Sequence, residues 1–198
     1  MTRMFVAVIP PESVLEDLEQ YVAPRRESDA LPGLRWTLPE QWHLTLAFSA
    51  DVPDRAYDDL VDRLHRAARK RRPTDARIAG GGAFPQVGKA KVLYAGIETT
   101  LDASPEVGAE ELRRMATGAR AAVAKAGAGV DGQRFRPHLT LARLGRPAEA
   151  TRLVRVLEAY RGPAWTAEEI ALVASHLGEG PRNRPRHEVV ETFTLGAG

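Results

Sequence analysis

The 198-residue chain contains no cysteine and no long hydrophobic run. The absence of cysteine excludes disulfides, thiolate zinc sites and a cysteine nucleophile. The apolar run at residues 4–9 is too short for a transmembrane helix or for the hydrophobic region of a signal peptide, and Pro10 and Pro11 end it. We therefore expect a cytoplasmic protein that makes no membrane contact.

A large excess of charge is also missing, because the formal net charge is only +2 at neutral pH. This balance permits an anionic substrate but does not by itself predict non-specific binding to nucleic acid. Hydrophobic residues make up 43% of the chain and charged residues 27%, as in ordinary soluble globular proteins. We find no linker between independent domains, so residues 1–198 are expected to form a single two-lobed domain.

What the chain does contain is a repeated pentapeptide, His-Leu-Thr-Leu-Ala, at residues 43–47 and again at residues 138–142. Side chains alternate between the two faces of a strand, so in each copy the histidine and threonine should share one face while the leucines enter a core. A single His-x-Thr on a strand is usually only part of a strand. Two of the five histidines in identical contexts are a much stronger signal.

The predicted function follows from what these side chains can do. An imidazole titrates near neutral pH, and a hydroxyl can donate a hydrogen bond to an anionic oxygen. If the two copies face each other, His43 and His138 would provide a general acid and a general base, and Thr45 and Thr140 would bind the oxygens of a phosphodiester. No group of His, Asp and Glu has the spacing of metal ligands, so we expect neither a metal nor another cofactor.

Hydrophobic periodicity and turn residues predict an α+β fold of alternating strands and helices. Adjacent strands favour antiparallel pairing, and the two motif strands, each expected to precede a proline-initiated helix, suggest duplicated sheets with pseudo-two-fold symmetry, outer helices and a central active-site cleft. Strands are predicted at residues 4–9, 34–37, 42–48, 75–79, 91–97, 136–143, 169–177 and 187–195. Helices are predicted at residues 12–26, 53–72, 106–125 and from Pro147 onward.

Three connecting segments carry specific expectations. The glycine run at residues 80–82 lacks a following Gly-Lys-Ser/Thr, which argues against a phosphate-binding loop and favours a tight turn between strands. Residues 99–107 are expected to form a loop. The arginine-rich residues 182–186 are expected in a hairpin loop, and the cationic residues 69–72 are expected to form a solvated helix end.

Residues 35–46 and 136–143 resemble the paired His-x-Thr signatures of the 2H phosphoesterases. Within that superfamily the chain is most similar to the LigT-like RNA 2′,3′-cyclic phosphodiesterases, historically called 2′-5′ RNA ligases, and the resemblance extends from the first strand to the last. It implies a bilobal antiparallel fold and metal-independent hydrolysis. The chain departs from the family pattern at residues 48–50, Phe-Ser-Ala where Phe-Leu-Gly is common, and at His187, where tyrosine is common.

The resemblance also implies roles for individual residues. His138 would be the base that activates water, and His43 the acid that protonates the leaving ribose oxygen. Thr45 and Thr140 would hold the non-bridging oxygens of the phosphate. Which histidine plays which part does not follow from the residues alone, because the two copies are equivalent.

Several further side chains are candidates for the same site. Arg143 follows the second motif and is typical of the family; a guanidinium could contact the phosphate at two points. Strand alternation nevertheless puts it on the leucine side unless the strand turns there. Phe84 is either a base-stacking residue or an ordinary rim aromatic. His176 and His187 could line the cleft, while His65 lies among charged residues and should be exposed.

The sequence thus predicts a hydrolase that opens a 2′,3′-cyclic phosphate at an RNA end, acting as a monomer with no obligatory protein partner. One alternative keeps the chemistry but changes the substrate to 2′-5′ linked or small cyclic nucleotides. A second alternative is a nucleotide-binding or RNA-binding module without turnover. Two intact histidines argue against the module, because binding alone needs no pair of proton-transfer groups.

Overall fold

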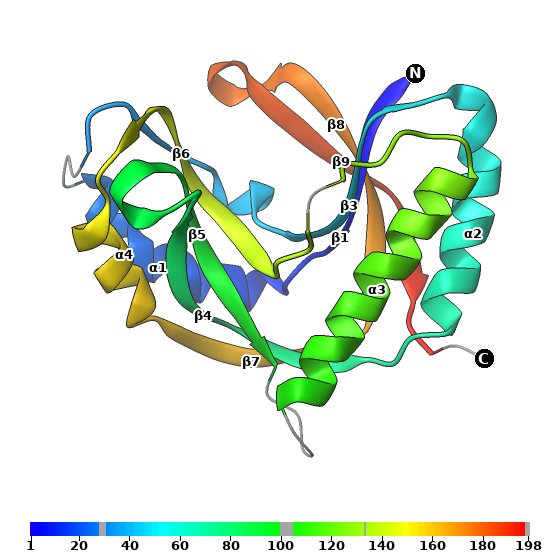
Figure 1. Ribbon diagram of the computed structural model, residues 1–198, viewed down its shortest axis with the longest axis horizontal. Helices are drawn as coiled ribbons and strands as arrows, with labels where there is room; N and C mark the ends of the chain where they lie inside the picture. The colour runs from blue at the N-terminus through cyan, green and yellow to red at the C-terminus, as the bar shows by residue number, and fades with distance from the viewer. Residues whose placement is uncertain (28–30, 100–104, 133, 197–198) are drawn as a thin grey trace.

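The computed structural model describes residues 1–27, 31–99, 105–132 and 134–196, which form four α-helices and nine strands (Figure 1). The α-helices are α1 (Glu12–Glu27), α2 (Tyr57–Arg69), α3 (Pro105–Lys125) and α4 (Thr151–Glu158). The strands are β1 (Thr2–Val8), β2 (Leu34–Trp36), β3 (Leu44–Val52), β4 (Thr74–Phe84), β5 (Ala90–Thr99), β6 (His138–Ala148), β7 (Arg161–Ala167), β8 (Glu169–Gly180) and β9 (Arg184–Thr194). Among the described residues, none of the helices is long and apolar enough to cross a bilayer.

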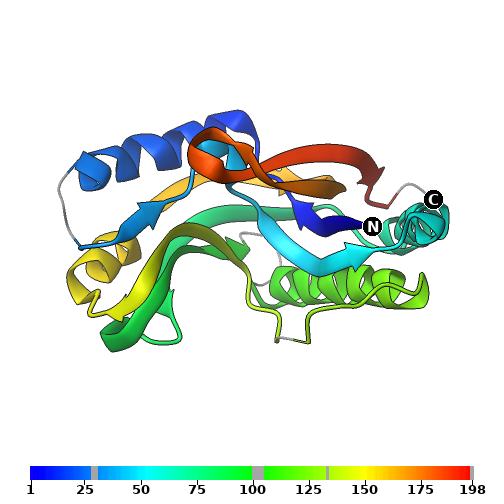
Figure 2. The same cartoon turned by 90° about the horizontal axis from the view of Figure 1, so that it is seen from above.

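The strands form one sheet in the order β7-β4-β5-β6-β3-β1-β8-β9, with β2 pairing with β6, and neighbouring strands run antiparallel. At the centre, β3 and β6 are joined through the single register pair Leu44 and Leu139. Helices α1 and α4 lie over one half of the molecule and α2 and α3 over the other (Figures 1 and 2). The fold is therefore α+β, as predicted, with two helix-covered halves that meet at the two motif strands.

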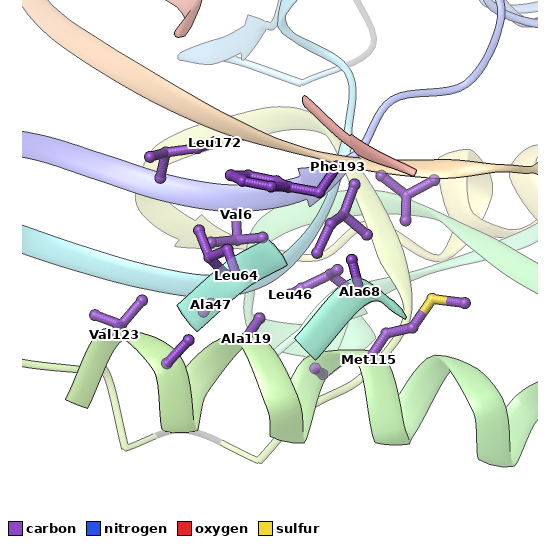
Figure 3. Close-up of a cluster of buried hydrophobic side chains, with 14 of the residues drawn as sticks. Val6, Leu46, Ala47, Leu64, Ala68, Met115, Ala119, Val123, Leu172 and Phe193 are labelled. Carbon is purple, nitrogen blue, oxygen red and sulfur yellow. The ribbon is translucent and has the colours of Figure 1, made fainter. Parts of the chain in front are cut away.

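Each half has its own hydrophobic core between its helices and one face of the sheet. Figure 3 shows the core of the α2/α3 half, where Leu46 and Val6 of the sheet lie against Leu64 of α2 and Ala119 of α3. The second core joins Leu139 and other sheet residues to α1 and α4. Small residues such as Ala119 allow α3 to approach the sheet closely, which excludes water from the leucine side of the first motif.

The predicted turn at residues 80–82 is wrong, because β4 continues through all three glycines to Phe84. Gly80 has a φ of +68° next to a shift in register, as in a β-bulge. A Cβ on Gly81 would lie 2.4 Å from the Cβ of Leu157, and one on Gly82 would lie 2.4 Å from the hydroxyl of Tyr94. The glycines therefore permit close packing against both faces of a strand rather than a reversal of the chain.

Other boundaries also differ from the predictions. Pro147 lies within β6 and starts no helix, since α4 begins at Thr151. Strand β7 was not predicted, because its Gly162 and Pro163 are typical of turns; at the edge of a sheet, however, proline is tolerated. Strand β9 begins at Arg184, so the predicted hairpin loop at residues 182–186 is partly strand. Of the predicted loop at residues 99–107, residues 100–104 lie outside the described residues, Thr99 ends β5 and residues 105–107 begin α3.

Candidate active site

The two pentapeptides lie side by side at the centre of the sheet. His43 immediately precedes β3 and His138 is the first residue of β6, so both motif strands begin two residues later than predicted. Leu44 pairs with Leu139 in antiparallel register. The neighbouring residues therefore lie opposite each other as well, His43 opposite Thr140 and Thr45 opposite His138. Diagonal neighbours in such a pair lie about 7–8 Å apart.

The predicted alternation of faces is confirmed. Leu44 and Leu139 are 1% and 0% exposed, whereas the histidine and threonine of each copy are only half-buried. The core helices pack on the leucine face. We call the opposite face, which carries the four polar motif side chains, the histidine face.

Both imidazoles are held in the same tautomer. Nδ1 of His43 lies 2.8 Å from the carbonyl oxygen of Gln41, and Nδ1 of His138 lies 2.7 Å from the carbonyl oxygen of Arg136. A carbonyl oxygen only accepts hydrogen bonds, so each Nδ1 carries the proton and donates it. In the neutral state each Nε2 is therefore an unprotonated base, and in the charged state each Nε2 is a proton donor.

Aromatic rings surround His43 differently from His138. The His43 ring is stacked on Phe5 with 4.3 Å between centroids, and His187 meets it edge-on at 5.4 Å. The His138 ring meets Phe84 and Tyr94 edge-on. Phe84 and His187, for which the sequence predicted no definite position, thus each lie beside a motif histidine.

The remaining histidines lie elsewhere. Nε2 of His176 is 3.0 Å from the Glu188 carboxylate, in an ion-pair network near the tip of the β8–β9 hairpin, and it makes no ring contact with either motif histidine in the described structure. His65 is exposed on α2, as predicted, with its ring against Phe193. Neither belongs to the candidate site.

The environment lowers the proton affinity of both motif histidines. Burial, followed by the positive charge of His187, lowers the pKa of His43 to about 3. Burial also lowers the pKa of His138, and the neighbouring Arg143 and Arg136 lower it further, against the hydrogen bond to a backbone carbonyl that raises it. Both imidazoles are therefore neutral near pH 7 in the unliganded protein.

A β-bulge in each motif strand determines where the next residue points. The register skips Leu46 in the first copy and Leu141, at the same position, in the second copy. A bulge allows two successive side chains to occupy one face, and Leu141 and Ala142 are both buried. The exposed side chain of Arg143 consequently lies on the histidine face, because the strand is not regular, as placement on the leucine side would have required.

The hydroxyl groups of Thr45 and Thr140 have no hydrogen-bond partner within the described part of the chain, and both side chains are half-buried. The structure thus brings together all five predicted site residues: two imidazoles, two unoccupied hydroxyls and one guanidinium. In the ranges that the structure describes, no group of three or more His, Cys, Asp or Glu side chains is arranged to hold a metal ion. A groove of about 630 Å³ between α2 and α3 lies apart from these residues, and half of its lining residues are cationic.

Comparison with known proteins identifies the class to which this site belongs. The family described as "LigT like Phosphoesterase" matches residues 8–94 and 102–182. The chain therefore belongs to the LigT-like phosphoesterases, a family of hydrolases, and the resemblance to 2H phosphoesterases expected from the motifs is confirmed.

Particular relatives agree over almost the full length. The chain is 36% identical to an RNA 2′,3′-cyclic phosphodiesterase of Thermus thermophilus over 98% of this chain and 90% of the relative, and 28% identical to one of Aquifex aeolicus over 99% and 98%. Among solved structures, the Thermus thermophilus protein TT0787 matches with a TM-score of 0.74 and 32% identity, covering 98% of each chain. Escherichia coli LigT, at 20% identity and a TM-score of 0.71 over 98% and 97% of the two chains, shares the fold.

Sequence reasoning missed two neighbours of the histidines, Phe5 and Tyr94. Both lie on strands that pair with the motif strands, β1 with β3 and β5 with β6. Their positions depend on the register between distant segments, which no local pattern reveals. The aromatic residue in each strand is visible in the sequence, but its partner across the sheet is not.

Proposed function

We propose that this protein hydrolyses the 2′,3′-cyclic phosphate at the 3′ end of RNA to a 2′-phosphomonoester. The observation that carries the proposal is the matched arrangement of His43 and His138, in which each Nδ1 is occupied by a backbone carbonyl and each Nε2 is left free on the same face. The name RNA 2′,3′-cyclic phosphodiesterase, given to relatives at 36% and 28% identity over nearly the whole chain, supports the same activity.

In the proposed reaction His138 is the base and His43 the acid. Nε2 of His138 takes a proton from water while the water oxygen forms a bond to phosphorus. The bond between phosphorus and the ribose O3′ breaks, and O3′ receives the proton carried by Nε2 of His43. His138 gains one proton and His43 loses one, so proton exchange with solvent restores both imidazoles. General acid–base help of this kind contributes about 10²–10⁴-fold per group.

The other three residues bind the phosphate in this proposal. The hydroxyls of Thr45 and Thr140 donate to the two non-bridging oxygens, whose negative charge strengthens the hydrogen bonds. The Arg143 guanidinium donates to the same group in a bidentate manner. The guanidinium is available because the bulge at Leu141, within the second pentapeptide, leaves Arg143 on the histidine face.

Substrate binding supplies the protonation state that the reaction requires. The unliganded site holds two neutral imidazoles, since burial lowers the pKa of both. A phosphate is negatively charged, and a nearby negative charge raises the pKa of an imidazole. The bound cyclic phosphate therefore favours the protonated form of His43, the proposed acid. Before substrate binds, His138, the proposed base, is unprotonated and can accept a proton.

One chain supplies all five residues, so the proposed site needs no second copy; we propose a monomer in which residues 1–198 work as one two-lobed domain on RNA ends. The test is to incubate the purified protein, in excess EDTA, with an oligoribonucleotide ending in a 2′,3′-cyclic phosphate and, separately, with 2′,3′-cyclic AMP. We expect turnover of the oligomer with the phosphate on O2′ of the product.

Other outcomes would overturn the proposal in distinct ways. Turnover of 2′,3′-cyclic AMP alone, or of a 2′-5′ linked oligomer supplied as a further substrate but not of the cyclic-phosphate oligomer, would assign a different substrate. Binding of the oligomer without turnover would indicate a binding module. Loss of activity in EDTA, with recovery on adding a divalent cation, would contradict the acid–base mechanism.

A further inference from the structure

Besides Arg143, two further arginines outside the pentapeptides, Arg35 and Arg3, lie on the histidine face. Arg35 of β2 is the direct register partner of Arg143 of β6. Directly paired residues of neighbouring strands point to the same face, so both guanidinium groups lie on the histidine face. Both side chains are exposed.

The third arginine, Arg3 of β1, occupies the corresponding place in the first half. The residue that follows the first pentapeptide is Phe48, at the position that Arg143 holds after the second pentapeptide. The Arg3 guanidinium lies over the Phe48 ring, with its carbon 4.5 Å from the ring centroid. Phe48 is paired with Phe5, which is stacked on His43. A guanidinium thus lies just after each His-x-Thr pair. In the second copy it belongs to Arg143 itself, and in the first copy it belongs to Arg3, which lies over the Phe48 ring.

Among the described residues, no negative charge is paired with this cluster. Within the described ranges, no carboxylate forms an ion pair with Arg3, Arg35 or Arg143, and no hydrogen-bond acceptor engages them. Like charges placed opposite each other on neighbouring strands are destabilising. In agreement with this proximity, burial and then the charges of Arg3 and Arg35 lower the pKa of Arg143. A cluster of this kind becomes favourable when an anion binds to it.

One cyclic phosphate does not use all of these donors. It carries a single negative charge, and in the proposed function two hydroxyls, an imidazolium and Arg143 already contact it. Guanidinium groups bind phosphate in particular, because their planar donors match two phosphate oxygens. In an RNA end, the anion nearest to the cyclic phosphate is the phosphodiester on the 5′ side of the terminal nucleotide.

We propose that Arg3 and Arg35, the two further arginines on the histidine face, form a subsite for this second phosphate. The enzyme would then prefer substrates that carry a phosphate 5′ to the terminal nucleoside, as every RNA oligomer does and 2′,3′-cyclic AMP does not. This inference rests on the proposed function and adds the substrate class that the site selects.

The experiment compares two mononucleotides that differ only in the second phosphate: adenosine 2′,3′-cyclic phosphate with a free 5′ hydroxyl, and the same compound with a 5′ phosphate. For the wild-type protein we expect kcat/KM to be at least about tenfold higher with the 5′ phosphate, through a lower KM, because hydrogen bonds between charged groups are stronger than those between neutral groups. In Arg35→Ala and Arg3→Ala the ratio of the two kcat/KM values should fall about tenfold. Arg35→Lys, which keeps the charge but loses the bidentate geometry, should give an intermediate ratio.

Arg152→Ala is the matched control, because Arg152 is an exposed arginine on α4, which packs on the leucine face. It removes the same charge and should leave the ratio unchanged. Equal wild-type rates for the two compounds, or an equal fall of the ratio in Arg152→Ala, would overturn the subsite. No turnover of either compound or of a cyclic-phosphate-terminated oligomer would instead overturn the proposed function. If Arg3→Ala does not fold, Arg35→Ala and Arg35→Lys still decide the question.

Discussion

The two copies of the pentapeptide share their local geometry but not their surroundings. Both copies bury their leucines, hold the imidazole through Nδ1 and contain a bulge at the second leucine. However, His43 is stacked on Phe5, whereas His138 meets two aromatic rings edge-on. The identical residues therefore place the two Nε2 atoms in the same way, and only the neighbours contributed by other strands distinguish the two imidazoles.

The neighbouring charges also differ between the copies. After burial, the pKa of His43 is lowered chiefly by His187, whereas the pKa of His138 is lowered by Arg143 and Arg136. Arginine is always charged, but a histidine loses its charge as the pH rises. The two copies of the motif therefore have different proton affinities because of contacts with distant segments, and the proposed division into an acid and a base relies on such contacts.

The largest expected effect is the loss of either imidazole. His43→Ala and His138→Ala should each lower kcat at least about 10²-fold, the low end for a general acid or base. The double variant should lose less than the product of the single losses, because both groups act on one transition state. His65→Ala, at an exposed position of α2 without ring contact to either motif histidine in the described structure, is the control and should retain activity. A folded single variant with near wild-type activity would remove that histidine from the mechanism.

The next effect concerns the two hydroxyls. Thr45→Val and Thr140→Val each delete one hydrogen bond to a charged oxygen, so each should cost about 1.5–3 kcal/mol in transition-state stabilisation. Losses of similar size in the two variants would support equal binding of the phosphate by both hydroxyls. Thr117→Val, on the exposed surface of α3, is the matched control for the substitution itself. Unchanged kcat/KM in both site variants would contradict the proposed contacts.

A stability measurement tests the packing behind the second copy alone. In Gly82→Ala the new methyl group would meet the Tyr94 side chain, which lies beside His138, so we expect a loss of about 1–3 kcal/mol in the free energy of unfolding. Gly88→Ala adds a methyl group with no atom within 4 Å and should change stability little. Equal denaturation midpoints for the two variants would show that the glycine run does not serve this packing.

The smallest effect is a shift of one pKa. His187→Tyr keeps an aromatic ring beside His43 but removes a group that can be charged, so the pKa of His43 should rise, by less than burial lowers it. The pKa of His138 should not change, since His187 does not contribute to it. Titration of the two imidazoles by NMR measures both values in one sample. A shift confined to His138 would contradict the different environments of the two copies.

The sequence predicted what depends on local alternation. The repeat of His, Leu and Thr was enough to place the imidazoles and hydroxyls on one face, because a strand has a period of two whichever strand lies beside it. The helices α1 and α3 followed from the spacing of apolar residues in the same way. These features require no knowledge of the rest of the chain.

The features that were missed depend on contacts between distant segments. The bulge that turns Arg143 toward the histidines is a mismatch between β5 and β6, and nothing in the residues Leu-Ala-Arg marks it. The presence of Arg3 and Arg35 beside Arg143 likewise requires the register of β1 and β2. Gly-Pro in β7 and the glycine run in β4 were misleading because edge position and close packing, which are tertiary properties, outweighed their usual preference for turns.

The pH dependence of kcat/KM tests the division into acid and base most directly, because it reports the ionisation of the free enzyme. For the wild-type protein we predict a bell-shaped profile of kcat/KM against pH. Both its rise and its fall should lie below pH 6.5, since the pKa of each histidine is lowered from that value. His138→Ala should keep only a decline with rising pH, which is the loss of the proton from the acid. His43→Ala should keep only a rise with pH, as the base loses its proton. A complete bell in either variant would contradict the two-histidine mechanism.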